Sequence, residues 1–391
     1  LYGSMFNFDG SHHDVSRWDA NWYKSIVDNG YQYDTNNQSN VAFFPLFPFI
    51  WKLLSCNAII MSIFNYCIFL MGFIILRNTF KFDNPLQLIL LSTGSFFFFM
   101  IPYSESLFFF GSTLILIGLH KDNTTLTTLG IFIACTTRSV SIIFIPLFIF
   151  TELLTWDYRS KKRILLYTTI TVISTLIVVL IQWFYTGEWF AFMKVQSAWH
   201  RVFTFPVLPF TTWDGFRLLW LDGLALYLVY ISFLLAIYKI VNKNFKNIQP
   251  LFRSNKSFVF SIGYMVSTGL TVLFFTSLDA RGMSTLYSLN RFIFATSFFI
   301  VIIYNLYQNI NVNPRTVFFF LLITISFWLL FEKQSLQYTI TYYGMIIMYL
   351  LLYFFCLDKK FSRKISIVVY FINLFVMLIL FSEFTKGTWI G

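Results

Sequence analysis

The sequence has few charged residues for its length. Only 12% of its 391 residues are Asp, Glu, Lys or Arg, whereas an ordinary soluble domain has about 25%. Hydrophobic residues make up 57% of the chain, and the mean hydropathy is +0.69. Because one water-soluble core cannot hide that much apolar surface, the composition excludes a soluble protein and indicates an integral membrane protein.

Cysteine is also scarce, and no two cysteines form a C-x-x-C pair. The four cysteines lie singly in or beside apolar runs, which supports neither a disulfide framework nor a zinc site. His12 and His13 are adjacent and point in different directions, so a metal site there is not expected. The first forty residues lack the apolar segment of a signal peptide. No repeat, linker or low-complexity tract divides the chain.

Apolar runs follow one another from residue 57 to the end of the chain. Several are shorter than the ~20 residues that a straight span needs. Segment 41–55, with Pro45 and Pro48, is predicted to be an interfacial entry to the first run. The sequence predicts about twelve transmembrane helices, at 57–77, 86–101, 104–119, 126–137, 139–154, 164–185, 218–239, 257–277, 290–306, 316–331, 337–356 and 365–384.

Basic residues cluster in loops that the predicted spans place on one side of the membrane. The positive-inside rule makes this the cytoplasmic side, and it explains the net charge of +11 without a nucleic-acid partner. The clusters are Arg159, Lys161, Lys162 and Arg163; Lys239, Lys243, Lys246, Arg253 and Lys256; and Lys359, Lys360, Arg363 and Lys364. The outer side then receives residues 1–40, the turns at 102–104 and near 138, the loops 186–217 and 278–289, and the C-terminal residues.

These patterns predict an all-α polytopic membrane protein with a single domain over residues 1–391. Since the chain would begin on the outer side, we expect that one N-terminal span is missing from this numbering. The domain is expected to comprise a first outer loop with its interfacial entry (1–56), membrane helices (57–185), an outer substrate loop (186–217) and C-terminal membrane helices (218–391).

The stretch "SRWDANWYKSIVDNGY" is a polar, Trp-rich segment in an otherwise apolar chain. Ser16 precedes Asp19 by three residues, as at a capped helix start, and Gly30 is a plausible helix end. A short interfacial helix over 17–28 is therefore expected, with Asp19, Trp22 and other residues on one face. From position alone, Asp19 is either a first-turn acid that the helix dipole favours or a catalytic group.

Four strings along the chain resemble sequences of one family. They occur in the family's order and lie on the predicted outer side. They are "RWDANWYKSIVDNGY" with the following "VAFFPLFP", then "PYSESLFF" (102–109), "TRSVSIIFIPLF" (137–148) and "TGEWFAFMKVQSAWHR" (186–201). The first resembles the first-loop signature of the PIG-V family, the GPI mannosyltransferase II-like proteins. That family belongs to the GT-C class of membrane glycosyltransferases, so a GT-C-like bundle is implied.

The resemblance implies an inverting transfer of a sugar, with mannose on a polyprenyl or dolichyl phosphate as the expected donor. Asp19 would be the general base, and a glycolipid or glycan hydroxyl the acceptor. The leaving phosphate would need cations, and arginine suits phosphate because its planar fork binds two oxygens. No D-x-D motif occurs in the outer loops, so no metal cofactor is expected. The remaining candidates are Arg138, Arg201 and Arg291 for the donor phosphate; Trp18, Trp22, Tyr23, Tyr103, Glu105, Gln196, Trp199 and His200 for substrate; and Asp14 as a second acid.

Several alternatives stay open at the level of sequence. Arg138 suits a snorkelling turn residue as well as a phosphate ligand, Arg291 suits an interface anchor, and Glu105 suits a structural ion pair, with Arg138 as one partner. A lipid or glycan flippase or transporter is a second functional class, and another lipid-linked sugar is compatible with the same enzyme class. An accessory membrane subunit is also compatible. The short loops favour a bacterial plasma membrane; a eukaryotic protein would lie in the endoplasmic reticulum membrane.

Overall fold

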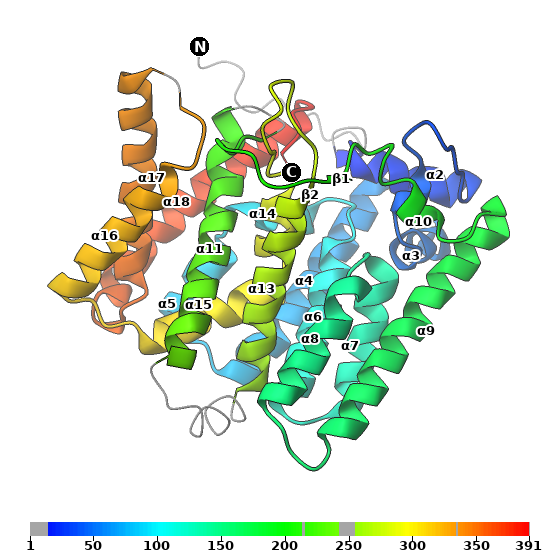
Figure 1. Cartoon of the computed structure of the whole chain (residues 1–391), viewed down its shortest axis with the longest axis horizontal. Helices are drawn as coiled ribbons and strands as arrows, with labels where there is room; N and C mark the ends of the chain where they lie inside the picture. The colour runs from blue at the N-terminus through cyan, green and yellow to red at the C-terminus, as the bar shows by residue number, and fades with distance from the viewer. Residues whose placement is uncertain (1–14, 213–215, 242–254, 334, 391) are drawn as a thin grey trace.

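The computed structural model describes residues 15–212, 216–241, 255–333 and 335–390, and these are mostly helical (Figure 1). The longer helices are α4 (Ala58–Phe80), α6 (Glu105–His120), α7 (Thr124–Thr137), α8 (Ser141–Leu154), α9 (Ser160–Thr186), α11 (Phe216–Val241), α13 (Lys256–Phe274), α15 (Ser297–Asn309), α16 (Pro314–Trp328), α17 (Leu336–Cys356) and α18 (Lys359–Thr385). The shorter elements are α2 (Asp19–Asn29), η1 (Asn40–Ala42), α3 (Leu46–Leu54), α5 (Asn84–Leu91), η2 (Gly94–Met100), α10 (Ala191–Lys194) and α14 (Leu289–Phe294). Strand β1 (Val202–Phe203) pairs antiparallel with β2 (Phe275–Thr276).

Every predicted apolar run forms a helix or a pair of helices, and the chain is a multi-pass integral membrane protein. Among the described residues, six helices are long and apolar enough to cross a membrane, or seven if the bent η2–α6 pair is one span. Helices α7, α8 and α16 are apolar but shorter.

Two of the predicted spans are not continuous helices. Run 86–101 divides into α5 and η2, and run 290–306 divides into α14 and α15. The second break arises because the Thr296 side chain accepts the backbone N–H of Phe299 and begins a new helix. Apolar periodicity does not reveal such local caps, so the prediction of unbroken spans was wrong at both places.

A buried amide supports the break that precedes α6. Elements η2 and α6 meet at an angle of 107°, and Asn65 of α4 donates to the carbonyls of Ile101 (2.7 Å) and Tyr103 (2.8 Å). An unsatisfied carbonyl costs several kcal/mol in an apolar medium, roughly 2–7 on transfer scales. Asn65 therefore stabilises the turn that positions Tyr103 and Glu105.

Helices α6 and α7 form an antiparallel hairpin with very close backbone contact. A Cβ added at Gly130 of α7 would lie 2.6 Å from the carbonyl oxygen of Gly111 in α6. Only glycine allows this approach, which is typical of helix pairs packed in membranes. The hairpin brings the first residue of α6, Glu105, next to the residue that follows α7, Arg138.

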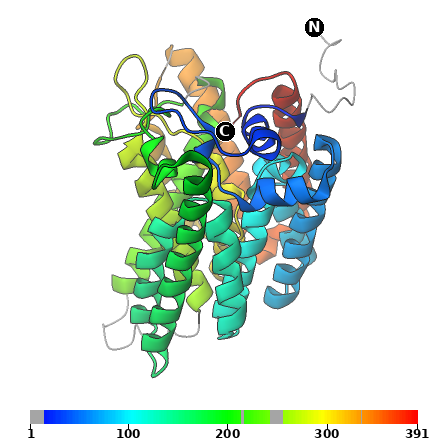
Figure 2. The ribbon, with the colours of Figure 1, turned by 90° about the vertical axis from the view of Figure 1, so that its right-hand side faces the viewer.

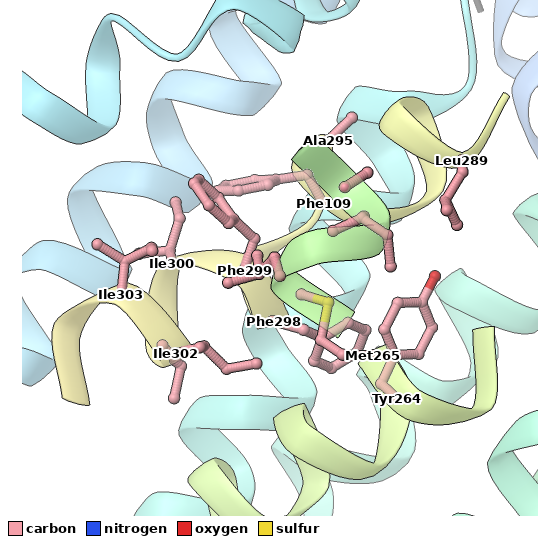
Figure 3. Packing of buried hydrophobic residues seen from close by; sticks show 14 of the residues in the cluster. Phe109, Tyr264, Met265, Leu289, Ala295, Phe298, Phe299, Ile300, Ile302 and Ile303 are labelled. Carbon is pink, nitrogen blue, oxygen red and sulfur yellow. The ribbon is translucent and has the colours of Figure 1, made fainter. Parts of the chain in front are cut away.

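The apolar core fixes α14 and α15 against α6 and α13. Tyr264 of α13 packs on Phe298 of α15 (Figure 3), with ring centroids 4.2 Å apart. Phe108 of α6 lies beside both rings, and all three side chains are buried. Burying side chains of this size contributes about 1.5–3 kcal/mol each. This packing places Arg291, on α14, at one end of the bundle.

The loops that were predicted to share one side of the membrane lie at one end of the helix bundle. Helices α2, α10 and α14 and the β1–β2 pair lie at one end of the bundle, whereas α9 and α13 begin at the opposite end (Figures 1 and 2). At that opposite end, buried Glu152 accepts hydrogen bonds from Arg163 and Ser160. Although burial alone would raise the pKa of Asp157, the hydrogen bond from Arg163 lowers it to about 2. These ion pairs connect the first turns of α9 and α13 to the end of α8.

Candidate active site

The short helix α2 begins at Asp19, and an unusual backbone turn precedes it. Trp18 has φ 53°, and no side chain caps the helix, so the predicted Ser16 cap was wrong. The Tyr103 hydroxyl replaces the cap: it accepts the Asp19 backbone N–H at 3.3 Å and donates to the Arg17 carbonyl at 3.2 Å. Gly30 ends the helix with φ 76°, as predicted. The packing of α2 thus depends on the break before α6.

Arg291 is the centre of a buried cluster of charges. Its Nη1 lies 2.8 Å from Oδ2 of Asp19, and its Nη2 lies 2.6 Å from Oε1 of Glu105. Arg138 Nη1 lies 3.2 Å from the same Glu105 oxygen, so the pairing that the sequence left open is present. Glu105 is 0% exposed and Arg291 3%. One guanidinium therefore connects both carboxylates and fixes Asp19 relative to the membrane helices.

Aromatic rings support the two guanidinium groups from the apolar side. The guanidinium carbon of Arg291 lies 4.8 Å from the ring centroid of Tyr103 and 5.2 Å from that of Phe98. Arg138 lies 5.0 Å from the ring of Phe292. Cation–π contacts of this kind contribute about 0.5–2 kcal/mol and restrict the orientation of the cation.

A polar cavity opens beside this cluster, with about 690 Å³ of space that is partly open to solvent. Seven of the predicted site residues line it: Asp19, Tyr23, Arg138, Gln196, Trp199, Arg201 and Arg291. They come from four segments that are far apart in the sequence and that were predicted to lie on the outer side. The remaining lining residues are Ala42, Phe43, Phe44, Thr137, Ser139, Tyr287, Ser288 and Phe292.

Arg201 is the cation in this cavity without an acid partner. Within the described part of the chain, no carboxylate lies within 4.0 Å of its guanidinium group. Its contacts are Oε1 of Gln196 at 3.4 Å and the ring of Tyr287, 5.2 Å from centroid to carbon. Burial lowers the pKa of Arg201 and raises that of Tyr287. Three guanidinium groups thus face two carboxylates, which leaves one positive charge for an anionic ligand.

Other predicted residues lie around the cavity without lining it. Tyr103 and Glu105 are buried behind it, Trp22 packs edge-on against Trp199 at 5.6 Å, and Trp18 is 41% exposed. His200 is exposed and lies outside the lining. The candidates Asp14, His12 and His13 lie outside the described residues.

Three residues around the site have backbone angles that side chains rarely adopt. Trp18, His200 and Ser288 have φ of 53°, 56° and 55°. Each such conformation costs about 1–3 kcal/mol, and such strain concentrates at functional sites. Trp18 precedes Asp19 and His200 precedes Arg201, whereas Ser288 lines the cavity itself and precedes α14. The strain is consistent with segments held in position for function.

Sequence reasoning missed two groups of residues at this site. Tyr287 and Ser288 line the cavity. Their position in the predicted outer loop 278–289 is the one sequence feature that could have indicated this. Buried Asp222 of α11 accepts hydrogen bonds from the backbone and side chain of Asn290, at 2.9 and 2.8 Å. It thereby fixes the residue before Arg291, a contact across 68 residues that no local pattern reveals.

An apolar cavity lies next to the polar one, between α2, α3, α7 and α9. It comprises about 1000 Å³ of space that is partly open to the surroundings. Neighbouring residues line the two cavities: Thr136 and Thr137, and Phe44 and Pro45. Its lining is Ile26, Gly30, Tyr31, Pro45, Leu46, Pro48, Phe49, Lys52, Phe132, Thr136, Ile177, Ile181 and Tyr185. An apolar ligand that filled it would end close to the charged cluster.

Within residues 15–212, 216–241, 255–333 and 335–390, no group of three or more His, Cys, Asp or Glu side chains could hold a metal ion. The charged groups that converge in this part of the chain are the carboxylates and arginines described above.

Comparison with known proteins identifies a solved structure with a similar fold. No protein-family model matches the sequence, and no curated protein matches it. The structure is similar to the crystal structure of ArnT from Cupriavidus metallidurans bound to undecaprenyl phosphate, with a TM-score of 0.50 and 10% sequence identity. The alignment covers 98% of this chain and 74% of ArnT. The fold of the chain is therefore similar to the GT-C fold of ArnT, whereas membership of the PIG-V family remains a prediction.

Proposed function

We propose that this protein transfers a sugar from a polyprenyl phosphate donor to an acceptor hydroxyl at the outer face of the membrane that it spans. The observation that carries the proposal is the polar cavity, where Asp19 faces three arginines next to an apolar cavity. A carboxylate beside a site for a lipid-linked anion is what such a transfer requires. The resemblance of the first-loop strings to GT-C enzymes supports the same reading.

Each of the two cavities is proposed to bind one chemical part of the donor. The prenyl chain occupies the apolar cavity, and the phosphate binds Arg201 and Arg138 in the polar one. A phosphodiester brings one negative charge, which matches the one guanidinium that has no acid partner. The undecaprenyl phosphate in the ArnT crystal structure is a ligand of the same chemical class.

The chemistry is a single displacement at the anomeric carbon. The acceptor oxygen forms a bond to that carbon while the bond to the phosphate oxygen breaks and its electron pair leaves with the phosphate. Asp19 takes the acceptor proton, because an alcohol is too weak an acid to ionise first. Arg291 holds the carboxylate in place, at 2.8 Å. Arg138 and Arg201 stabilise the charge that develops on the phosphate.

The sugar and acceptor rest on the resemblance to the PIG-V family. It favours mannose and a glycolipid or glycan hydroxyl. The short loops favour a bacterial plasma membrane, and a eukaryotic protein would act in the endoplasmic reticulum membrane. The experiment supplies a panel of polyprenyl phosphate sugars to the purified full chain in lipid bilayers. It measures the released lipid phosphate and the glycosylated product. Equal amounts of both are expected. Transport of the intact donor without release of phosphate would contradict the proposal and favour a flippase.

Filling the apolar cavity should weaken donor binding. Ile181 on α9 lines that cavity, whereas its neighbour Leu180 is 50% exposed. Ile181→Trp is expected to raise the KM for a long-chain donor by about tenfold or more, since one bulky ring excludes several methylene groups. Steady-state kinetics with donors of different chain length measures this. Leu180→Trp is the matched control, and an equal effect of both variants would contradict the placement of the lipid chain.

The reaction is proposed to need no metal ion. Arg138 and Arg201 supply the positive charge that a metal provides in nucleotide-sugar enzymes, where the leaving group is a diphosphate. Incubation with a chelator such as EDTA should leave the transfer rate unchanged, and a lost rate restored by Mg²⁺ or Mn²⁺ would overturn this part of the proposal.

A further inference from the structure

A row of aromatic rings extends from Trp18, the residue before Asp19, to Tyr287, which lines the polar cavity, and includes a residue from the segment after α18. Trp389 stacks on Tyr287, with centroids 5.9 Å apart and an interplanar angle of 24°. Trp18 meets Trp389 edge-on at 5.2 Å. The row begins next to Asp19 and ends at Tyr287, which contacts Arg201. We call Trp18, Trp389 and Tyr287 the aromatic row.

The segment that carries Trp389 is fixed in position by buried contacts. The Asn290 side chain donates to the carbonyl of Ile390 at 3.2 Å, and Ile390 is 3% exposed. Asn290 is itself held by Asp222 at 2.8 Å. Arg291, the next residue, lies 6.0 Å from the Trp389 ring. One buried pair, Asp222 and Asn290, thus positions both the central arginine of the site and the aromatic row.

The rings of the row are only partly covered. Trp18 is 41% exposed, and Trp389 and Tyr287 are intermediate between buried and exposed. Here the rings lie beside carboxylate and guanidinium groups and in contact with solvent, the arrangement of a site that takes an amphipathic ligand.

Helix α2 separates the aromatic row from the apolar cavity. Its first residue, Asp19, lines the polar cavity, whereas Ile26 and Gly30 near its end line the apolar cavity. A lipid-borne donor and a second substrate would therefore reach Asp19 from opposite ends of α2. The donor side is apolar, and the other side presents the partly exposed rings.

We propose that the aromatic row is the acceptor subsite and binds the pyranose ring of a saccharide acceptor. The apolar C–H faces of the sugar pack on the rings, and its hydroxyl groups bind the neighbouring polar side chains. This inference rests on the proposed sugar transfer, and it assigns the acceptor a site formed in part by the segment after α18. Trp389 contributes to acceptor binding and not to the donor site.

The test measures acceptor and donor binding separately in the full chain. Octyl α-D-mannoside is the acceptor probe, with a polyprenyl phosphomannose as donor. Trp389→Ala should raise the acceptor KM by about tenfold while the donor KM changes by less than about twofold. Trp389→Phe, which keeps a ring, should have a smaller effect. Trp189→Ala is the matched control, because Trp189 lies in the outer loop 186–217 and stacks on Trp183 instead.

A binding measurement without turnover distinguishes this inference from the proposed function. Isothermal titration of octyl α-D-mannoside measures the acceptor affinity without turnover. An affinity that falls about tenfold in Trp389→Ala supports the subsite even if no donor in the panel is consumed. Unchanged affinity and acceptor KM in Trp389→Ala would overturn the inference and leave the proposed transfer intact. An equal rise in donor and acceptor KM would also overturn it, because the residue would then act on the whole site.

Discussion

Replacing Asp19 with Asn is expected to lower the rate of sugar transfer by about 10²–10⁴-fold, the usual contribution of a positioned general base. The amide keeps the shape of the side chain but cannot take the acceptor proton. Donor binding should change little, since the phosphate is assigned to Arg138 and Arg201. Single-turnover kinetics with saturating donor separates the chemical step from binding.

The same helix offers a matched control for this variant. Asp28 is exposed and pairs with Lys24 one turn earlier, away from the polar cavity. Asp28→Asn should leave the rate within about twofold of the wild type, as surface ion pairs contribute little. Asp19→Asn with the wild-type rate would remove Asp19 from the base role.

Replacing Glu105 with Gln is expected to have the largest effect on stability. Two guanidinium groups, from Arg138 and Arg291, share one oxygen of this carboxylate, and the side chain is 0% exposed. Removing one member of a buried ion pair leaves an uncompensated charge and typically costs about 3–5 kcal/mol. Activity should fall too, because Arg291 also positions Asp19. Thermal unfolding of the purified protein in detergent measures the stability.

The control for this stability effect is another acid in an ion pair. Glu188 pairs with Lys194 in the outer loop, and both side chains are partly exposed. Glu188→Gln should change the free energy of unfolding by less than about 1 kcal/mol. If Glu105→Gln unfolds at the wild-type temperature, the carboxylate does not hold the charged cluster together.

Much of the fold follows from local sequence patterns. Apolar runs and loop charges predicted which segments are helices and which loops share a side, because membrane insertion depends on these properties alone. They also placed Asp19, Arg138 and Arg201 on the same side, and the structure brings these residues to one cavity. The helix end at Gly30 follows from the positive φ that glycine tolerates.

The rest depends on contacts between distant segments. The cap of α2 comes from the Tyr103 hydroxyl, 84 residues from Asp19, so the local Ser16 motif misled the prediction. Arg291 suited an interface anchor equally well because its two acid partners lie on other helices. Trp389 had no signal beyond its predicted side, since its neighbours in space are Trp18 and Tyr287.

The anomeric configuration of the product tests the central claim, a single displacement with Asp19 as base, most directly. NMR of the product formed from a donor of known configuration assigns the anomer from the one-bond coupling between C1 and H1, because the H1–H2 coupling is small in both anomers of a mannoside. The account predicts complete inversion relative to the donor. Retention would require a covalent glycosyl–enzyme intermediate, with a carboxylate as nucleophile, and would contradict the assignment of Asp19.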